Sequence, residues 1–201
     1  NAEFRRWKAS HSSSAIGGKS LDMDLQPVAK VSWEDAAGFC NWLSKRDGLP
    51  PFYRLEAGMI NGFNWDSHGY RLPTEAEWAW AAKIDANSKS TTFPWVNGLY
   101  PPVEITDNYA DQSASRLLSF TIANYNDKSP VSAPVGSFKP NNKGLYNMSG
   151  NVAEWVNDYY DVRPRRGDAI QDPTGPTTGT RYVIRGASWA LGSRTELRLS
   201  Y

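Results

Sequence analysis

Residues 147–154 combine the side-chain types and the backbone freedom that a hard metal ion needs. Asn147 and Glu154 carry oxygen donors, and Gly150 lies between them. Ca²⁺ takes about six to eight oxygen ligands from carboxylates, side-chain amides and backbone carbonyls, and glycine lets a loop curl so that its carbonyls turn inward. The acidic spacing of an EF-hand loop is absent. The segment therefore indicates either a calcium loop or a plain Gly/Asn turn that leads into an aromatic-ended strand.

Two helices and a few short elements are expected to position this segment. Ser32 is a good N-cap and predicts a helix that runs to about Arg46. Thr74 and Glu77 form a capping-box pattern, which predicts a second helix over about 75–83. Shorter elements are expected at 2–9, where the pattern is helical, and at 52–55, 134–138, 153–159 and 182–188.

The bulk composition limits the classes of partner. A chain of 201 residues fits one domain, and its formal net charge of +1 gives no indication of a nucleic-acid or membrane partner. No apolar run approaches the roughly 20 residues of a membrane span, so we expect no transmembrane segment in this chain. The abundance of Trp, Tyr, Pro and Gly predicts long ordered loops packed around aromatic rings. A small basic cluster is interpreted as a solvated loop, with an anionic partner as the alternative: Arg163, Arg165 and Arg166.

Soft and borderline metal ligands are scarce. Cys40 is the only cysteine, which excludes an intrachain disulfide and a cysteine-based metal cluster. Its place on an apolar helical face favours a small buried hydrophobe. His11 and His68 both lie in polar loop sequence. A non-haem iron site often needs two His and a carboxylate on one face of the metal, so no iron site is expected within this chain.

Five motifs occur in order along the chain, at 69–82, 93–95, 133–138, 144–155 and 185–189. In this order they resemble the formylglycine-generating enzyme family, also called the sulfatase-modifying-factor family, from about residue 28 to residue 201. The resemblance implies an α+β fold, a variant of the C-type-lectin-like fold with two main helices, small sheets and much ordered loop. It also implies a single domain over 1–201. The chain lacks the strand that usually precedes its first residues, so we expect a fragment of a longer precursor.

The resemblance implies two structural calcium sites, each built from side-chain oxygens and backbone carbonyls. The first is implied at Asn147, Gly150, Val152 and Glu154, where Gly150 and Val152 act through their carbonyls. The second is implied at Asn108, Tyr109, Asp127 and Ser129, where Tyr109 and Ser129 act through their carbonyls. Calcium is therefore the expected cofactor, with a structural role.

The same resemblance argues against the family's oxidase chemistry. Formylglycine-generating oxidases hold copper with two cysteines, five residues apart, just after a Gly-Gly-Ser-aromatic motif that residues 186–189 match, with Ala187 in place of the second Gly. The cysteine positions fall on Leu191 and Glu196. Leu cannot bind a metal, and a carboxylate is too hard a ligand for Cu(I). We therefore expect neither copper nor iron, and no formylglycine-generating activity.

A candidate ligand surface follows this motif. The family's active-site groove lies there, and an aromatic, an aliphatic, a cation and a hydroxyl are close in sequence: Trp189, Leu191, Arg194 and Thr195. Trp and Arg are the residue types that most often dominate binding hot spots. The alternative interpretation is that Trp189 packs in the core.

Two interpretations of function remain open. The leading one is a non-catalytic binding or scaffold module that binds an unidentified protein partner or small ligand. It would be part of a larger, extracytoplasmic (periplasmic or secreted) assembly. The alternative is a metal-dependent oxidase or oxygenase whose metal ligands come partly from another domain or chain.

Overall fold

The structure is a computed structural model that describes residues 1–84, 89–95, 98–162 and 170–201. It contains three α-helices: α1 (Ala2–Trp7), α2 (Trp33–Arg46) and α3 (Glu75–Lys83). Both longer helices begin at the predicted residues. The Ser32 hydroxyl accepts from the N–H of Asp35 at the start of α2. Of the described helices, none has the length and apolar character that crossing a membrane requires.

The start of α3 is fixed by a reciprocal capping box. The Thr74 hydroxyl accepts from the N–H of Glu77 at 3.2 Å, and the Glu77 carboxylate accepts from the N–H of Thr74 at 2.7 Å. This arrangement satisfies two backbone groups that a bare helix end leaves unpaired. It also fixes the register of α3, and with it the direction of the Trp78 side chain.

The strands form three antiparallel pairs. They are β1 (Ala15–Ile16) with β2 (Lys19–Ser20), β3 (Tyr53–Glu56) with β4 (Met59–Phe63), and β5 (Glu154–Tyr159) with β6 (Tyr182–Arg185). In the last pair Glu154 faces Arg185 and Tyr159 faces Tyr182, with an irregularity between them. The predicted α+β class, with two main helices and small sheets, is confirmed.

Two expected elements differ from the structure. The short element expected at 134–138 is a turn, closed by a hydrogen bond from the N–H of Ser137 to the carbonyl of Pro134. Strand β6 ends at Arg185 instead of residue 188. Gly186 follows it with a φ of +79°, a conformation that leaves the extended region. The chain therefore turns away from the sheet just before the Ser-aromatic pair.

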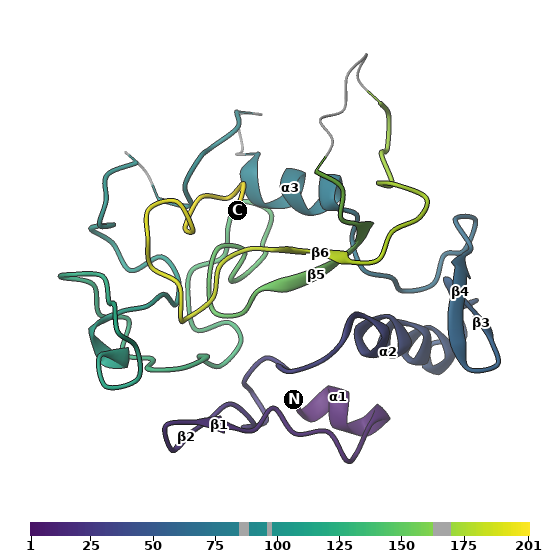
Figure 1. Ribbon diagram of the computed structural model, residues 1–201, viewed down its shortest axis with the longest axis horizontal. Coiled ribbons are helices and arrows are strands. Elements are labelled where there is room, and N and C mark those ends of the chain that lie inside the picture. Colours follow the sequence, from purple (N-terminus) through teal and green to yellow (C-terminus); the bar gives the residue numbers. More distant parts are fainter. Residues whose placement is uncertain (85–88, 96–97, 163–169) are drawn as a thin grey trace.

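The β5–β6 pair lies between two helices (Figure 1). Helix α3 packs on both strands from one side. On the other side Trp33, the first residue of α2, donates its indole N–H to the carbonyl of Val156 at 2.9 Å and stacks on Tyr182 with ring centroids 3.6 Å apart. The loops that connect α3 to β5 lie beside this layer, on the left of Figure 1.

The connecting loops pack around their own aromatic core. It comprises Phe93, Trp95, Tyr109, Ile122, Tyr125, Ala187 and Leu197. Tyr109 and Tyr125 are fully buried, and the Tyr125 hydroxyl donates to the carbonyl of Asp107 at 2.6 Å. Aromatic rings of this kind supply a large apolar area and one polar group each, so they can order loops that have few strand hydrogen bonds.

Candidate calcium loops and ligand surface

Residues 147–154, here called the first loop, end where β5 begins. This places the Glu154 carboxylate at the start of a strand, where Trp78 of α3 donates its indole N–H to Oε2 at 2.6 Å. Asn147 and Asn151 have φ values of +57° and +67°, a conformation that Asn adopts more readily than most residues. The first loop is therefore tightly coiled and tied to α3.

The Asn147 amide is held by a residue of a distant loop. Its Nδ2 donates to Oδ1 of Asp107 at 2.6 Å. Because a side-chain amide has one NH₂ group and one oxygen, this bond fixes which way the Asn147 oxygen faces. The same Asp107 carboxylate accepts from the N–H and the hydroxyl of Ser149, at 3.3 and 2.9 Å.

Asp107 is a functional candidate that sequence reasoning missed. The sequence does not single it out, although it is 2% exposed and bonded to the first loop. The available signal was an acidic residue directly before a predicted ligand, in a segment with no Lys or Arg close by in the sequence. Its partners lie 40 and 42 residues away in the chain, so no local pattern could identify them.

The four residues of the second predicted site, here called the second cluster, are Asn108, Tyr109, Asp127 and Ser129, and hydrogen bonds join the last three. The Asp127 carboxylate accepts from the N–H of Tyr109 at 3.1 Å and from the N–H of Ser129 at 2.9 Å. Asp111 supports this arrangement, because its Oδ2 accepts from the N–H of Asp127 at 2.6 Å. The carboxylates of Asp127 and Asp111 therefore hold the second cluster through hydrogen bonds that they accept from backbone N–H groups.

Asn108 leaves one polar atom without a partner. The residue is fully buried, and its amide oxygen accepts no hydrogen bond in the part of the chain that the structure describes. Its Nδ2 donates to the carbonyl of Val131 at 2.8 Å and to Oδ1 of Asn151 at 3.1 Å. Turning the amide round would lose both bonds. An unsatisfied buried polar group costs about 1–3 kcal/mol, and a cation bound to this oxygen would remove that cost.

Gly150 is where the first loop touches the second cluster. A Cβ at this position would lie 2.5 Å from the carbonyl oxygen of Asn108 and 3.0 Å from Cγ of Asp107, closer than packed atoms allow. Next to it, the N–H of Asn151 donates to the same Asn108 carbonyl at 2.8 Å. Glycine is therefore required here for steric reasons. Val152, the other predicted carbonyl donor, follows in the same loop.

Burial raises the pKa of three carboxyl groups, those of Glu154, Asp127 and Asp107. Desolvation raises the pKa of Glu154 to about 7, aided by the negative charge of Asp107 and opposed by the Trp78 hydrogen bond. Desolvation also raises the pKa of Asp127 to about 7, and the charges of Asp111 and Asp107 add to it. The pKa of Asp107 is raised by burial too, against the hydrogen bonds from Asn147, Asn108 and Ser149.

The chemistry of these groups fits a hard divalent cation. The predicted donors are carboxylate, amide and carbonyl oxygens, the set that Ca²⁺ prefers. Over the described residues, no group of three or more His, Cys, Asp or Glu side chains is arranged to hold a metal ion. His11 is half-buried with a ring nitrogen 3.1 Å from the carbonyl of Ala29, and His68 is exposed.

The two positions that correspond to the oxidase cysteines have structural surroundings. Leu191 is half-buried against the aromatic core of the loops. The Glu196 carboxylate accepts from the N–H groups of Gly192 and Ser193, at 3.3 and 2.9 Å. Burial by itself would raise the pKa of Glu196. The hydrogen bonds from Ser193 and Gly192 outweigh that effect, so the pKa of Glu196 is lowered. Cys40 lies in α2, where burial raises the pKa of its thiol to about 11.

The four predicted ligand-surface residues differ in exposure. Trp189 is 8% exposed and packs with Leu21 and Val131. Arg194 and Thr195 are exposed, and the Arg194 guanidinium lies 5.7 Å from the centroid of the Phe93 ring. The exposed part of this surface is therefore formed by Arg194 and Thr195, with Leu191 half-buried beside them.

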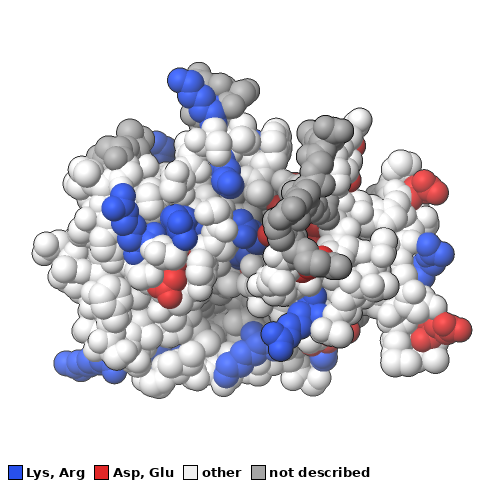
Figure 2. Space-filling model, turned by 45° about the horizontal axis from the view of Figure 1, so that its top comes forward, with Lys and Arg blue, Asp and Glu red and all other residues white. Residues whose placement is uncertain are grey.

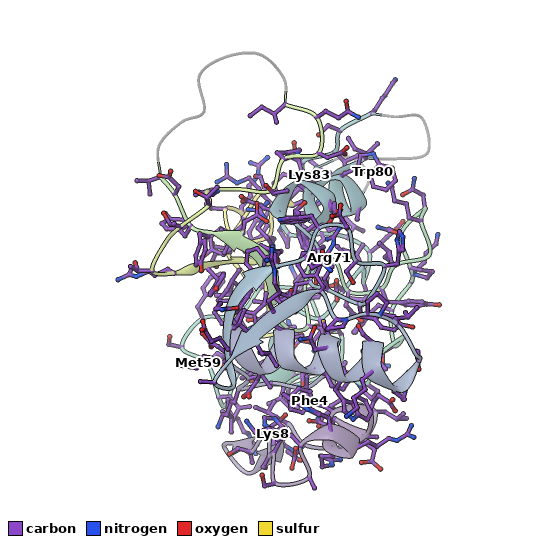
Figure 3. All side chains as sticks on the ribbon, turned by 90° about the vertical axis from the view of Figure 1, so that its right-hand side faces the viewer. Phe4, Lys8, Met59, Arg71, Trp80 and Lys83 are labelled. Atoms are coloured by element: carbon purple, nitrogen blue, oxygen red, sulfur yellow. The ribbon has the colours of Figure 1, made fainter. Side chains whose placement is uncertain are left out.

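A pocket of about 900 Å³ opens beside α3 and reaches Glu154. The exposed indoles of Trp65 and Trp80 contribute to its wall, together with Arg71, whose two terminal nitrogens bind the Glu77 carboxylate at 2.7 Å each. Figure 3 shows Trp80 on α3, with Arg71 below it toward the β3–β4 pair. Sequence reasoning did not predict this pocket, because its walls come from separate parts of the chain.

Charge is dispersed over the face of the molecule that Figure 2 shows. On the face shown in Figure 2, Lys and Arg side chains lie in several separate places, with Asp and Glu among them. This agrees with the formal net charge of +1. The predicted basic cluster of Arg163, Arg165 and Arg166 lies outside the described residues.

Comparison with known proteins gives a consistent result. The family described as "Sulfatase-modifying factor enzyme 1-like domain" matches residues 5–200. The chain is 33% identical to a Mus musculus protein named formylglycine-generating enzyme, over 84% of this chain and 37% of that protein. It is 30% identical to another Mus musculus protein, named inactive C-alpha-formylglycine-generating enzyme 2, over 81% of this chain and 37% of that protein.

A solved structure is similar over the whole described fold. The protein titled "Treponema denticola variable protein 1" superimposes with a TM-score of 0.72 at 28% identity, and the match covers 100% of this chain and 74% of that one. The likeness confirms the predicted variant of the C-type-lectin-like fold. The chain spans about a third to a half of the length of the curated relatives that it matches first.

Proposed function

Because the chain belongs to the sulfatase-modifying factor enzyme 1-like domain family, we propose that it is a calcium-stabilised domain that works as a non-catalytic binding or scaffold module. The observation that carries this proposal is the buried amide oxygen of Asn108, which has no partner among the described residues. Asp127, the other side-chain donor of the second cluster, accepts from the N–H of Tyr109, the residue that follows Asn108.

Calcium would be held at two places. In the first loop the ligands are the side chains of Asn147 and Glu154 and the carbonyls of Gly150 and Val152. In the second cluster they are the side chains of Asn108 and Asp127 and the carbonyls of Tyr109 and Ser129. The bound ion supplies positive charge next to buried carboxylates, and because it binds only the folded chain it stabilises that state.

The non-catalytic part of the proposal rests on thiol chemistry. Copper-dependent formation of formylglycine needs thiolates, and the positions for them carry Leu191 and Glu196. Cys40 lies elsewhere, in α2, and its raised pKa of about 11 keeps the thiol protonated near neutral pH. A similar mouse protein is itself named an inactive formylglycine-generating enzyme.

The binding part of the proposal uses the surface after the Gly-Ala-Ser-Trp motif. Arg194 and Thr195 are exposed there and Leu191 is half-buried beside them, a combination suited to a protein partner or a small ligand. Trp189 is buried in a core cluster with Leu21 and Val131 and is not part of the exposed surface. We propose an extracytoplasmic place of action, within a larger assembly.

One specific observation favours a second candidate. The chain is 33% identical to a mouse protein named formylglycine-generating enzyme. An oxidase or oxygenase that completes its metal site with ligands from another domain or chain would share this similarity. In that case the purified protein should carry copper or iron when its partner is present.

Metal analysis and melting separate the two candidates. We expect calcium, and neither copper nor iron, in near-stoichiometric amounts in protein purified without chelator. Calcium at about 100 times its dissociation constant should add about 2.7 kcal/mol to the free energy of unfolding, so the melting temperature should fall in chelator. Magnesium at the same concentration is the control. Stoichiometric copper or iron, or formylglycine formation in a Cys-x-Pro-x-Arg peptide, would contradict the proposal.

A further inference from the structure

Asp107 makes three hydrogen bonds to the first loop. Its Oδ1 accepts from Nδ2 of Asn147 at 2.6 Å, and its Oδ2 accepts from the hydroxyl and the N–H of Ser149, at 2.9 and 3.3 Å. The residue is 2% exposed, so water does not compete for these bonds. A buried carboxylate that accepts several hydrogen bonds holds its donors in one geometry.

Asp107 is also part of the backbone that carries the second cluster. Its Oδ1 accepts from the backbone N–H of Asn108 at 2.8 Å. Asn108 is the residue whose side-chain amide oxygen has no partner among the described residues. Asn151 of the first loop closes the connection from the other side. It donates its N–H to the Asn108 carbonyl at 2.8 Å and accepts from Nδ2 of Asn108 at 3.1 Å.

These contacts make the two places one hydrogen-bonded unit. The Asn147 oxygen can face a cation only while its Nδ2 faces Asp107, and the Asn108 oxygen can do so only while its Nδ2 faces Asn151 and Val131. Gly150 brings the two backbones into direct contact, since a Cβ there would lie 2.5 Å from the Asn108 carbonyl oxygen. An ion that orders one side therefore orders the other.

We propose that Asp107 is a positioning residue that couples the two calcium sites, so that calcium bound at either one raises the affinity of the other. This inference rests on the calcium binding proposed above and adds a property to it. The order that Asp107 imposes is established once, by the first ion, and the second ion binds loops that are already ordered. Coupling between two sites in proteins is usually about 5- to 150-fold in affinity, and it is reciprocal.

The test is a thermodynamic cycle on chelator-stripped protein, titrated with Ca²⁺ alone by isothermal calorimetry. Glu154→Gln disables the first loop and Asp127→Asn disables the second cluster, so each variant reports the other site in isolation. Both are then repeated in an Asp107→Ala background. Asp158→Asn is the matched control, because Asp158 is also a buried carboxylate but serves the start of α3, where its Oδ2 accepts from the N–H of Glu75 at 2.8 Å.

In the wild type we expect two ions, and each site should bind roughly 5- to 150-fold more tightly when the other site is already occupied than it does in the single-site variant. In Asp107→Ala this ratio should fall to about one, and in Asp158→Asn it should persist. If Asp107→Ala fails to fold, as judged by near-ultraviolet circular dichroism in calcium, Ser149→Ala replaces it. That change removes one Asp107 contact and should reduce the ratio.

The possible failures are distinguishable. Absence of calcium uptake by the wild type would overturn calcium binding itself, and the coupling with it. Two ions that bind independently in the wild type would overturn the coupling alone, without affecting the proposed function. The coupling would be equally contradicted by a ratio that survives in both Asp107→Ala and Ser149→Ala.

Discussion

Glu154 and Asp127 are carboxyl groups in surroundings that disfavour their charge. The pKa of each is raised by burial to about 7, from the ordinary range near 4. In the calcium-free protein the folded state therefore keeps protons that the unfolded chain releases. The resulting stability is fully present below the unfolded pKa of about 4 and is lost as the pH rises through about 7. Calcium should reverse this trend, because it replaces the protons.

The first prediction follows for Glu154→Gln. In chelator at about pH 8 this variant should be more stable than the wild type, by up to about 3 kcal/mol, because a neutral amide avoids the burial of a charge. In saturating calcium it should be less stable, because a charged ligand is lost. Thermal unfolding in both buffers, from about pH 5 to pH 8, checks this reversal. A variant that is destabilised equally in both buffers would argue against calcium at the first loop.

At the same scale, sequence reasoning identified the ligand candidates but not what holds them. The family resemblance implied Asn108 and Asp127, and in the structure the Asp127 carboxylate accepts from the N–H of Tyr109, the residue that follows Asn108. Asp107 was not singled out, because its role depends on Asn147 and Ser149, which become its neighbours only in the folded chain. Contacts over such sequence distances leave no periodicity that a single sequence can reveal.

At the scale of elements, helix α3 connects a local signal to the candidate metal site. The Thr74 hydroxyl accepts from the N–H of Glu77, and one turn later Trp78 binds Glu154. Thr74→Ala removes an N-cap and should cost about 1 kcal/mol, within a range of roughly 0.5–2 kcal/mol. Thr74→Ser retains the oxygen and should remain within a few tenths. Urea unfolding of the three proteins checks the ranking, and equal stability of Thr74→Ala and wild type would contradict it.

The elements that were predicted well are those with local capping signals. Helices α2 and α3 begin at Ser32 and Thr74, because a hydroxyl that binds a nearby N–H needs no distant partner. Strand β4 (Met59–Phe63) was not predicted. It follows a turn in which Ala57 and Gly58 both have positive φ, and Ala is a weaker signal for such a turn than the usual Asn or Asp.

At the scale of the whole molecule, a core residue and an exposed residue of the proposed ligand surface lie in the same short segment, at Trp189 and Arg194. Trp189→Ala should lower the free energy of unfolding by about 3–5 kcal/mol, because its side chain lies in the core. Arg194→Ala should change it by less than about 0.5 kcal/mol, because Arg194 is exposed. Chemical denaturation measures both. If Arg194→Ala also keeps full affinity for a partner captured by the wild type, the proposed ligand surface is wrong.

The family assignment also belongs to this scale. Five motifs spread over most of the chain predicted it, and the match over residues 5–200 confirms it. Activity could not be predicted in the same way, because it depends on a few positions within that frame. Leu191 and Glu196 occupy two of them, one half-buried against the aromatic core and the other at the cap of a turn.

The contact between Trp78 and Glu154 gives the protein an internal optical reporter. The indole of Trp78 is 2% exposed, and its N–H lies 2.6 Å from the carboxylate oxygen that calcium or a proton would neutralise. Indole emission responds to the electric field along the ring, so the fluorescence spectrum should shift as calcium binds, with no added label. Trp78→Phe should abolish the shift, whereas the exposed Trp80→Phe should retain it. A shift that persists without Trp78 would assign the signal to another indole.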